Sequence, residues 1–207
     1  MTLDGATPIG VTPDDVTPDE VTLPSWVPDI EDKPAPMPLL VVQSFVNTLD
    51  ADNHTDRLAR DDDARAWLAE AGLPYANGDL NLVREVRESI RALIGRDPLT
   101  PDELRPLETV LASAQPRLEV TRHGQVRLAP AGTVTSSVAD GLMHLLLIIR
   151  DAQADGTWDR LKLCGNPDCR WAFYDRSHSR RGAWCDMATC GNRIKNRNLR
   201  ARRRPPP

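Results

Sequence analysis

Four cysteines, all that the 207-residue chain contains, lie in two close pairs near its C-terminal end. They are Cys164, Cys169, Cys185 and Cys190, with four residues inside each pair and fifteen between the pairs. Two tight turns that each supply two thiolates can assemble a tetrahedral site, and soft thiolates favour zinc, with iron as the alternative. Four cysteines fill the coordination shell, so the spacing predicts one structural ion and no catalytic metal.

The segment around these cysteines has few apolar side chains with which to form a core. Trp171, Phe173, Tyr174 and Trp184 are nearly half of the large aromatic residues of the chain, and we expect them to pack around the metal. Zinc binding would then supply much of the folding free energy, on the order of 10 kcal/mol in small zinc modules.

The positive charge of the chain is concentrated in the same region. From Arg160 onward there are 13 Lys and Arg residues against three Asp, a net charge of +10. The overall formal charge of −4 leaves −14 for the residues before Arg160. Such an asymmetry indicates a basic segment that meets a polyanion.

A basic helix is predicted over residues 186–204. Met187, Cys190 and Ile194 recur on the side that would face the metal, and arginines recur on the opposite side. Asn196 has the amide that pairs with adenine in the major groove. The candidate nucleic-acid contacts are Arg193, Lys195, Asn196, Arg197, Arg200, Arg202, Arg203, Arg204, Arg180 and Arg181.

The predicted function is that of a zinc-dependent DNA-binding protein and transcription regulator. One alternative is an RNA-binding or ribosome-associated zinc protein, and another is an adaptor that docks its basic helix on an acidic protein. Two simpler interpretations stay open: some arginines neutralise the −2 charge of a zinc tetrathiolate, or the basic run is a solvated tail. Residues 39–155 contain no phosphate loop, nucleophile elbow or catalytic dyad, and we do not expect an enzyme.

Three segments are expected along the chain: an acidic, proline-rich tail over residues 1–38, a helical domain over 39–155 and the zinc module over 159–204. The tail contains the degenerate repeat VTPDDVTPDEVTLPS, in which proline and the lack of large apolar groups predict disorder. It is either a solvated linker or an acidic competitor for the basic end of the chain.

The middle segment alternates helical and strand patterns. In the stretch LNLVREVRESIRALIG an apolar stripe is expected, with Gly95 as a stop signal, and Thr100 to Glu103 predicts a capping box. The alternation in RLEVTRHGQVRLAP predicts a hairpin that turns at Gly124. The stripe residues are Leu82, Val86, Ile90, Leu93 and Ile94.

A further helix over residues 138–152 is apolar nearly all round, which places it centrally in a core or at the interface of a homodimer. His144 within it either packs in the core or lines a ligand pocket. The expected fold class is α+β, predominantly α: a helical N-terminal domain with one β-hairpin, followed by a small treble-clef-like module that ends in the basic helix.

The stretch MTLDGATPIG has neither the basic nor the apolar region of a signal peptide, and the longest apolar run, Leu145–Ile149, is too short to span a bilayer. We therefore expect a cytoplasmic, nucleoid-associated protein without a membrane partner. In a reducing cytosol, clustered cysteines hold metal rather than form disulfides.

The stretch from Leu161 to Arg204 resembles the CGNR zinc finger family, through LCGNPDC, FYDRS and WCDMATCGNR. The resemblance implies that the four cysteines hold zinc. FVNTLD, followed by helices and a hairpin, is similar to the ABATE domain that usually precedes this finger. Together they imply a bacterial, stress-related transcription regulator whose finger binds DNA. Family members often carry basic residues just before the Trp-Cys pair, where this chain has Gly182-Ala183 and its arginines, Arg180 and Arg181, lie slightly earlier.

Overall fold

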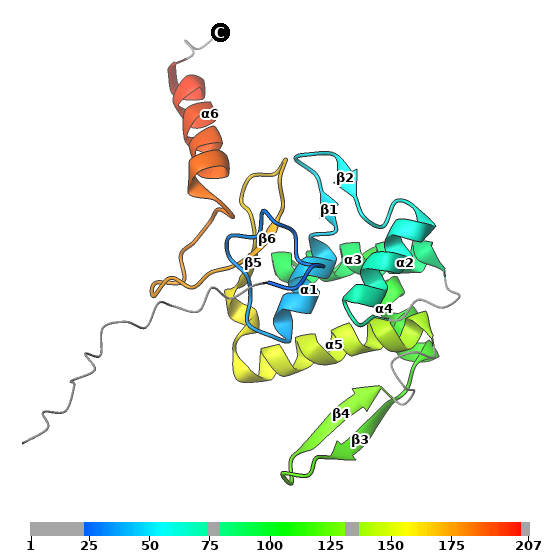
Figure 1. Cartoon of the computed structure of the whole chain (residues 1–207). Helices are drawn as coiled ribbons and strands as arrows, with labels where there is room; N and C mark the ends of the chain where they lie inside the picture. The colour runs from blue at the N-terminus through cyan, green and yellow to red at the C-terminus, as the bar shows by residue number, and fades with distance from the viewer. Residues whose placement is uncertain (1–22, 74–78, 131–136, 204–207) are drawn as a thin grey trace, which may run out of the picture.

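The computed structural model describes residues 23–73, 79–130 and 137–203 (Figure 1). Helices dominate, and the strands form three two-stranded antiparallel sheets within the described residues. The elements are α1 (Leu39–Val46), β1 (Leu49–Asp50), β2 (Thr55–Asp56), α2 (Asp61–Glu70), α3 (Leu80–Gly95), α4 (Pro101–Ser113), β3 (Pro116–Val120), β4 (Val126–Pro130), α5 (Val138–Asp155), a 3₁₀ turn (Trp158–Arg160), β5 (Leu161–Leu163), β6 (Ala172–Tyr174), a π turn (Met187–Gly191) and α6 (Asn192–Arg203). The predicted α+β class with mainly α structure is confirmed.

The core forms where α1 and α5 meet α3 and α4. Every residue of α1 is buried, and α5 buries Leu142, Leu145, Ile148 and other apolar side chains along its length. The apolar helix predicted over residues 138–152 is therefore central to the core. None of the helices in the described ranges combines the length and apolar character that a bilayer-spanning segment needs.

The capping box at the start of α4 and the turn of the β3–β4 hairpin form as predicted. The Thr100 side chain accepts from the backbone N–H of Glu103, whose carboxylate accepts from the Thr100 backbone at 2.8 Å, so the capping box is present. Pro106 lies inside α4 without ending it. Strands β3 and β4 pair in register, with Gly124 at φ 76° in the turn.

Helix α3 departs from its predicted stripe. Val86, Ile90 and Ile94 are buried, but Val83 takes the place expected for Leu82, and Leu93 is only half-buried. The left-handed residue after the helix is Arg96 rather than Gly95. The buried surface of α3 differs from the single apolar stripe because the helix also packs on a second side, where Arg87 and Arg91 are buried.

The buried arginines of α3 bind oxygen atoms of neighbouring segments. Arg87 donates to both carboxylate oxygens of Asp56, at 2.6 and 3.0 Å. Arg91 donates to the carbonyls of Val46 at 2.7 Å and of Arg170 at 3.0 Å. A guanidinium is buried without a large loss of stability only when its donors are satisfied, and here they hold loops against the helix.

The expectation of disorder over residues 1–38 is wrong for its second part. Residues 1–22 lie outside the described residues, whereas residues 23–38, here called the strap, pack against the body. Trp26, Val27 and Ala35 are buried, and the Trp26 carbonyl accepts from the Trp67 indole at 2.9 Å. The strap has no regular periodicity, so its order comes from tertiary contacts that composition does not reveal.

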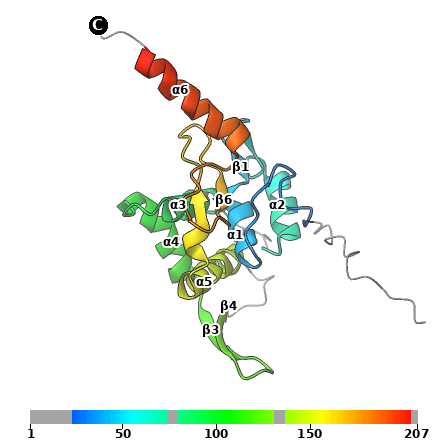
Figure 2. The same cartoon turned by 90° about the vertical axis from the view of Figure 1, so that its left-hand side faces the viewer.

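The C-terminal module shares the core of the helical domain. Trp158, Leu161, Ala172 and Tyr174 belong to the same buried cluster as α1, α3 and α5. Strands β5 and β6 lie against α3 and α1, and α6 then extends away from the body (Figures 1 and 2). The module is therefore joined to the rest of the molecule through a continuous apolar interior.

Candidate metal centre and basic helix

The structure brings the four predicted cysteines together. Cys164 directly follows β5, and Cys169 lies shortly before β6. Cys185 precedes the π turn, and Cys190 lies within it. Their sulfur atoms all lie within 4.8 Å of one another, and all four are free thiols. Two pairs distant in sequence thus converge on one point, as their spacing predicted.

The sulfur spacing fits a zinc ion. Four sulfurs at 2.3 Å from a tetrahedral zinc would lie about 3.8 Å apart. The Sγ of Cys185 lies 3.7 Å from that of Cys169 and 3.8 Å from that of Cys190. The donor set, four soft sulfurs in a largely buried place, is also the one that zinc prefers.

Each thiol of the cluster affects the titration of its neighbours. Hydrogen bonds from the Cys169 and Cys185 thiols hold the pKa of Cys164 well below its usual range. The pKa of Cys169 is raised to about 12 and that of Cys185 is raised further, chiefly because each thiol donates to Cys164. Without a cation one thiolate is favoured at the expense of its neighbours, and a divalent ion removes this conflict.

Backbone and amide groups position the sulfurs. Asn166, buried inside the first pair, directs its side-chain N–H toward the Cys190 sulfur at 3.7 Å and accepts from Cys169 and Arg170 through its carbonyl. Asp186 caps the π turn by accepting from the N–H groups of Ala188 and Thr189 at 2.9 and 2.8 Å. Such outer contacts fix the orientation of ligand side chains.

The aromatic residues divide between two environments. Trp171 and Trp184 pack beside the cysteines, as expected. Tyr174 instead belongs to the core of the helical domain, and Phe173 is buried with the Lys33 ammonium 5.0 Å from its ring centre. The expectation that all four surround the metal is wrong for these two. Alternation along β6 accounts for Tyr174, which lies on the same side as Ala172 and joins the core with it.

Gln43 in α1 and Asn47 at the C-terminal end of α1 bind backbone groups of the C-terminal module. Asn47 donates to the Ala172 carbonyl and accepts from the Ala172 N–H, each at 2.8 Å. Gln43 donates to the same carbonyl at 3.2 Å and to that of Lys33 at 3.1 Å. Tyr174 N–H donates to the Lys33 carbonyl at 2.9 Å. These bonds join strap, α1 and β6 into one unit.

A buried carboxylate completes that unit. Glu31 of the strap accepts from the Trp171 indole at 3.1 Å, from Asn47 at 3.0 Å and from the Lys33 N–H at 3.2 Å. Burial raises the pKa of Glu31 to about 7, although the three hydrogen bonds act in the opposite direction. The junction between strap and module therefore contains a carboxyl group that titrates near neutrality.

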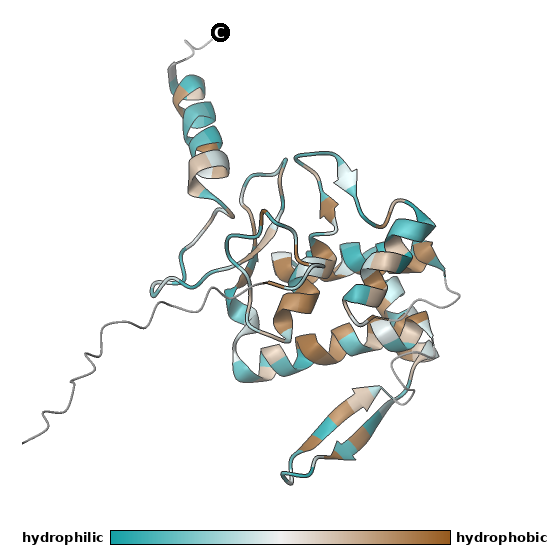
Figure 3. Ribbon diagram, in the orientation of Figure 1, coloured by the Kyte–Doolittle hydropathy of each residue, from teal (hydrophilic) through white to brown (hydrophobic). Residues whose placement is uncertain are grey.

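The basic helix begins later than predicted. Asp186 is a cap, residues 187–191 form the π turn, and α6 starts at Asn192. Met187 is 43% exposed, so it is not buried on the inner side of the helix as expected. Half of the twelve residues of α6 are Lys or Arg, and most of the helix is hydrophilic in Figure 3.

The predicted arginine stripe is split into two groups. Near the base of α6, Nη1 of Arg193 donates to both carboxylate oxygens of Asp52, at 2.6 and 2.7 Å, and Arg197 pairs with Asp168 at 2.6 Å. Other basic side chains of α6 are exposed and, among the described residues, have no ion-pair partner. These exposed groups are Lys195, Arg200 and Arg202.

The remaining candidates lie at the edges of this surface. Asn196 is exposed on α6, and Arg180 and Arg181 are exposed on the loop before Cys185. Arg203 is the last residue of α6, and Arg204 lies outside the described residues. The structure thus gathers most of the predicted contacts on or beside one helix.

Gly182 stands where a side chain would not fit. A Cβ built there would lie 2.9 Å from the Asp175 carboxylate, which accepts from the Gly182 N–H at 2.7 Å and from Lys162 at 2.8 Å. Burial would raise the pKa of Asp175, but these bonds and those from Ser177 lower it overall. This position serves the loop's architecture, not an anion contact.

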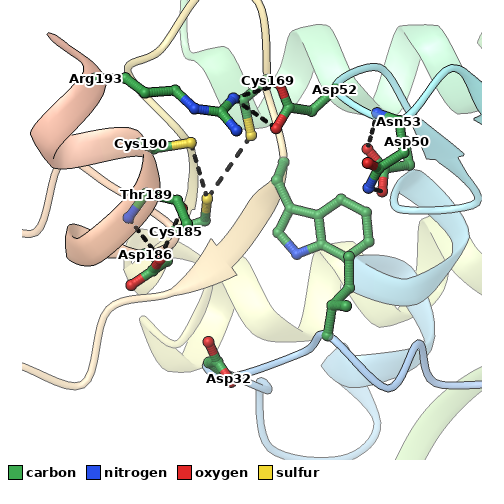
Figure 4. Close-up of a pocket in the computed structure, with 12 residues that line it drawn as sticks. Asp32, Asp50, Asp52, Asn53, Cys169, Cys185, Asp186, Thr189, Cys190 and Arg193 are labelled. Atoms are coloured by element: carbon green, nitrogen blue, oxygen red, sulfur yellow. Dashed lines mark hydrogen bonds and ion pairs between the residues drawn. The ribbon is translucent and has the colours of Figure 1, made fainter.

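An open cavity of about 360 Å³ lies between the cysteines and the β1–β2 loop (Figure 4). Its walls include Asp32, Asp50, Asp52 and Asp186, and Arg193 is the one cationic side chain among the described lining residues. The negative walls disfavour phosphate on this side of α6.

The sequence did not reveal the acidic partners of α6 or the polar junction. Asp52 and Asp168 are far from α6 in sequence and belong to no basic-acidic pattern along the chain. Asn47 lies in the FVNTLD stretch, which indicated a family but no role. The roles of these residues depend on contacts between segments that are far apart in sequence, so only the structure identifies them.

Comparisons with known proteins agree with this architecture. A family model described as "CGNR zinc finger" matches residues 160–203, and the ABATE model, described as "Putative stress-induced transcription regulator", matches residues 41–154. No protein of curated function matches the chain. The ABATE match spans more than half of the 207 residues. With four cysteines positioned to hold a metal at its C-terminal end, the chain belongs to the ABATE family and carries a CGNR zinc finger.

Proposed function

We propose that the protein is a zinc-dependent, DNA-binding transcription regulator that binds duplex DNA through exposed basic side chains of α6. The observation that carries the proposal is a helix that projects from the body with exposed Lys195, Arg200 and Arg202, none of them in an ion pair among the described residues. Basic side chains bind phosphates and release counterions, which is the main source of DNA affinity.

The dimensions of α6 suit a DNA groove. Its twelve residues span about 18 Å, and the major groove admits one α-helix. Asn196 is exposed on the same helix, where its amide can contact a base edge. We assign Arg193 and Arg197 a secondary role in DNA binding, since each already forms an ion pair with an acidic side chain of the protein.

We assign one zinc ion to Cys164, Cys169, Cys185 and Cys190. Bound there, zinc would fix the two cysteine pairs relative to the start of α6. Four thiolates leave no position for a substrate, which supports a binding role rather than a catalytic one.

The zinc assignment is tested by measuring metal content. The purified protein is expected to contain one zinc per chain by elemental mass spectrometry, and Cys185→Ser to lose it. Ser177→Ala, on an exposed loop of the same module, is the control and is expected to keep it. A parent protein that folds fully with no metal would end this assignment.

The DNA assignment is tested with the double variant Arg200→Ala/Arg202→Ala in fluorescence anisotropy. Its affinity for duplexes of any sequence is expected to fall, and the slope of log affinity against log salt to decrease by about two counterions. Arg150→Ala, which removes an exposed arginine from α5, is the matched control.

Two further results separate the alternatives. Tighter binding to single-stranded RNA than to duplex DNA would favour the RNA-binding function. If the double variant binds duplex DNA as the parent does, or if the parent binds neither nucleic acid, α6 is not a DNA-binding element and an acidic protein becomes the better partner.

A further inference from the structure

The β3–β4 hairpin exposes an apolar face. Leu118, Val120 and Val126 are 72%, 73% and 65% exposed, on a hairpin that projects from the body (Figures 1 and 3). The register places Leu118 opposite Leu128 and Val120 opposite Val126, so these side chains share one side of the sheet. Leu128 packs on the core, and farther out no residue of the described ranges covers the face.

The outer edge of β3 has backbone groups available for pairing. Pro116 lies opposite Pro130, and because neither has an N–H, this is a non-hydrogen-bonded position of the ladder. Alternate pairs bond, in agreement with the 2.8 Å bond from Thr121 N–H to the Gln125 carbonyl. The N–H and C=O groups of Leu118 and Val120 therefore point outward, where β4 does not reach them.

The position of β3 leaves this edge accessible. In the part of the chain that the structure describes, β3 pairs only with β4, and β4 is the strand that lies against α5. A free edge next to exposed apolar side chains is a template for another strand. Its sequence decides which strand fits.

We propose that the outer edge of β3 pairs antiparallel with β3 of a second copy of the chain, across a two-fold axis at Leu118. In this register Arg117 lies opposite Glu119 of the partner subunit, and Glu119 lies opposite Arg117 of the partner subunit. The contact is self-complementary, as a two-fold interface requires. The apolar faces of both hairpins join into one four-stranded surface.

A second copy fits this edge better than an unrelated partner. The charges of β3 alternate in sign about Leu118, so the strand matches its own reverse. Within one chain Arg117 pairs with Glu119 at 2.7 Å and Arg127 pairs with the same carboxylate at 3.2 Å, and the dimer would extend this network across the axis. The hairpin also lies at the end of the molecule opposite α6 in both views, so pairing leaves the basic helix free (Figures 1 and 2).

The test is the mass of the full-length, zinc-loaded protein in solution, by light scattering and sedimentation over a range of concentrations. The parent is expected to reach twice the 23.0 kDa mass of one chain. Arg117→Glu places four acidic side chains at the axis, and Glu119→Arg places four basic ones. Each variant is expected to raise the dissociation constant by about tenfold or more.

An equal mixture of the two variants separates this register from any other interface. In a mixed pair every acidic side chain lies opposite a basic one, so the mixture is expected to form heterodimers with near-parental affinity. Arg105→Glu, the same charge reversal at an exposed site of α4, is the control and is expected to dimerise as the parent does. Circular dichroism verifies that each variant is folded.

Three results would overturn the proposal. The first is a parent that stays monomeric up to about 100 μM, where even weak specific association is visible. The second is a parent dimer that neither charge reversal weakens. The third is a pair of weakened variants whose mixture does not recover, which would assign the dimer to another surface or register.

Discussion

The ion pair between Arg193 and Asp52 connects the base of α6 to the helical domain. Exposed pairs of this kind are weak, so DNA phosphate can compete with the carboxylate. Asp52→Asn is expected to tighten duplex binding by about twofold to fivefold and to steepen the salt dependence by about one counterion. Asp151→Asn, which removes an exposed, arginine-paired acid from α5, is the control in the anisotropy assay. Unchanged affinity would mean that Arg193 stays bound to the body in the complex.

The buried Glu31 makes stability depend on pH. Its pKa is raised from 4.5 to about 7 in the folded protein, so the folded state holds the proton more tightly than the unfolded chain. The stability from this group is fully present below pH 4.5 and is lost as the pH rises through 7. Relative to Glu31→Gln, the parent is expected to lose up to about 3 kcal/mol of unfolding free energy across this window. Urea denaturation of both proteins at several pH values measures the difference, and a constant difference would contradict it.

At the scale of elements, α1 and β6 depend on each other through Asn47. Asn47→Ala removes two bonds to the buried backbone of Ala172, leaving Gln43 as a partner of its carbonyl but none for its N–H. Unsatisfied buried backbone groups are costly, so we expect a loss of about 2–4 kcal/mol in unfolding free energy. Asn53→Ala, on the exposed β1–β2 loop, controls for the loss of an amide. A loss equal to that of the control would show that the junction tolerates water.

Elements with local causes were predictable, and elements with tertiary causes were not. The capping box of α4 and the turn at Gly124 depend on neighbours in sequence, so both followed from the residues alone. The order of the strap depends on Trp26 reaching α2 and on Lys33 reaching β6. The cysteine spacing predicted the cluster because four ligands must share one ion, but no comparable constraint linked Asp52 to Arg193.

The whole molecule is expected to respond to metal removal as one unit. Leu161, Ala172 and Tyr174 complete the core of the helical domain, so losing the metal should loosen more than the residues around it. In hydrogen exchange, a chelator is expected to reduce amide protection in α1 and β6 together, while the exposed turn near Gly124 stays unchanged as an internal reference. Protection of α1 that survives chelation would show that the helical domain is stable without its C-terminal module.

The bond between Tyr174 and Lys33 joins residues that are 141 positions apart. A ribosome releases the chain from its N-terminal end, so the strap, α1 and α3 emerge long before the strand that completes them. Until then the apolar side of α1 that receives Ala172 and Tyr174 is open, and contacts of such long sequence separation form slowly. The native core can therefore close only after β6 has been synthesised. A product truncated before β6 would expose the apolar side of α1 and would lack the basic helix. Such a product is expected to be a substrate for chaperones and proteases.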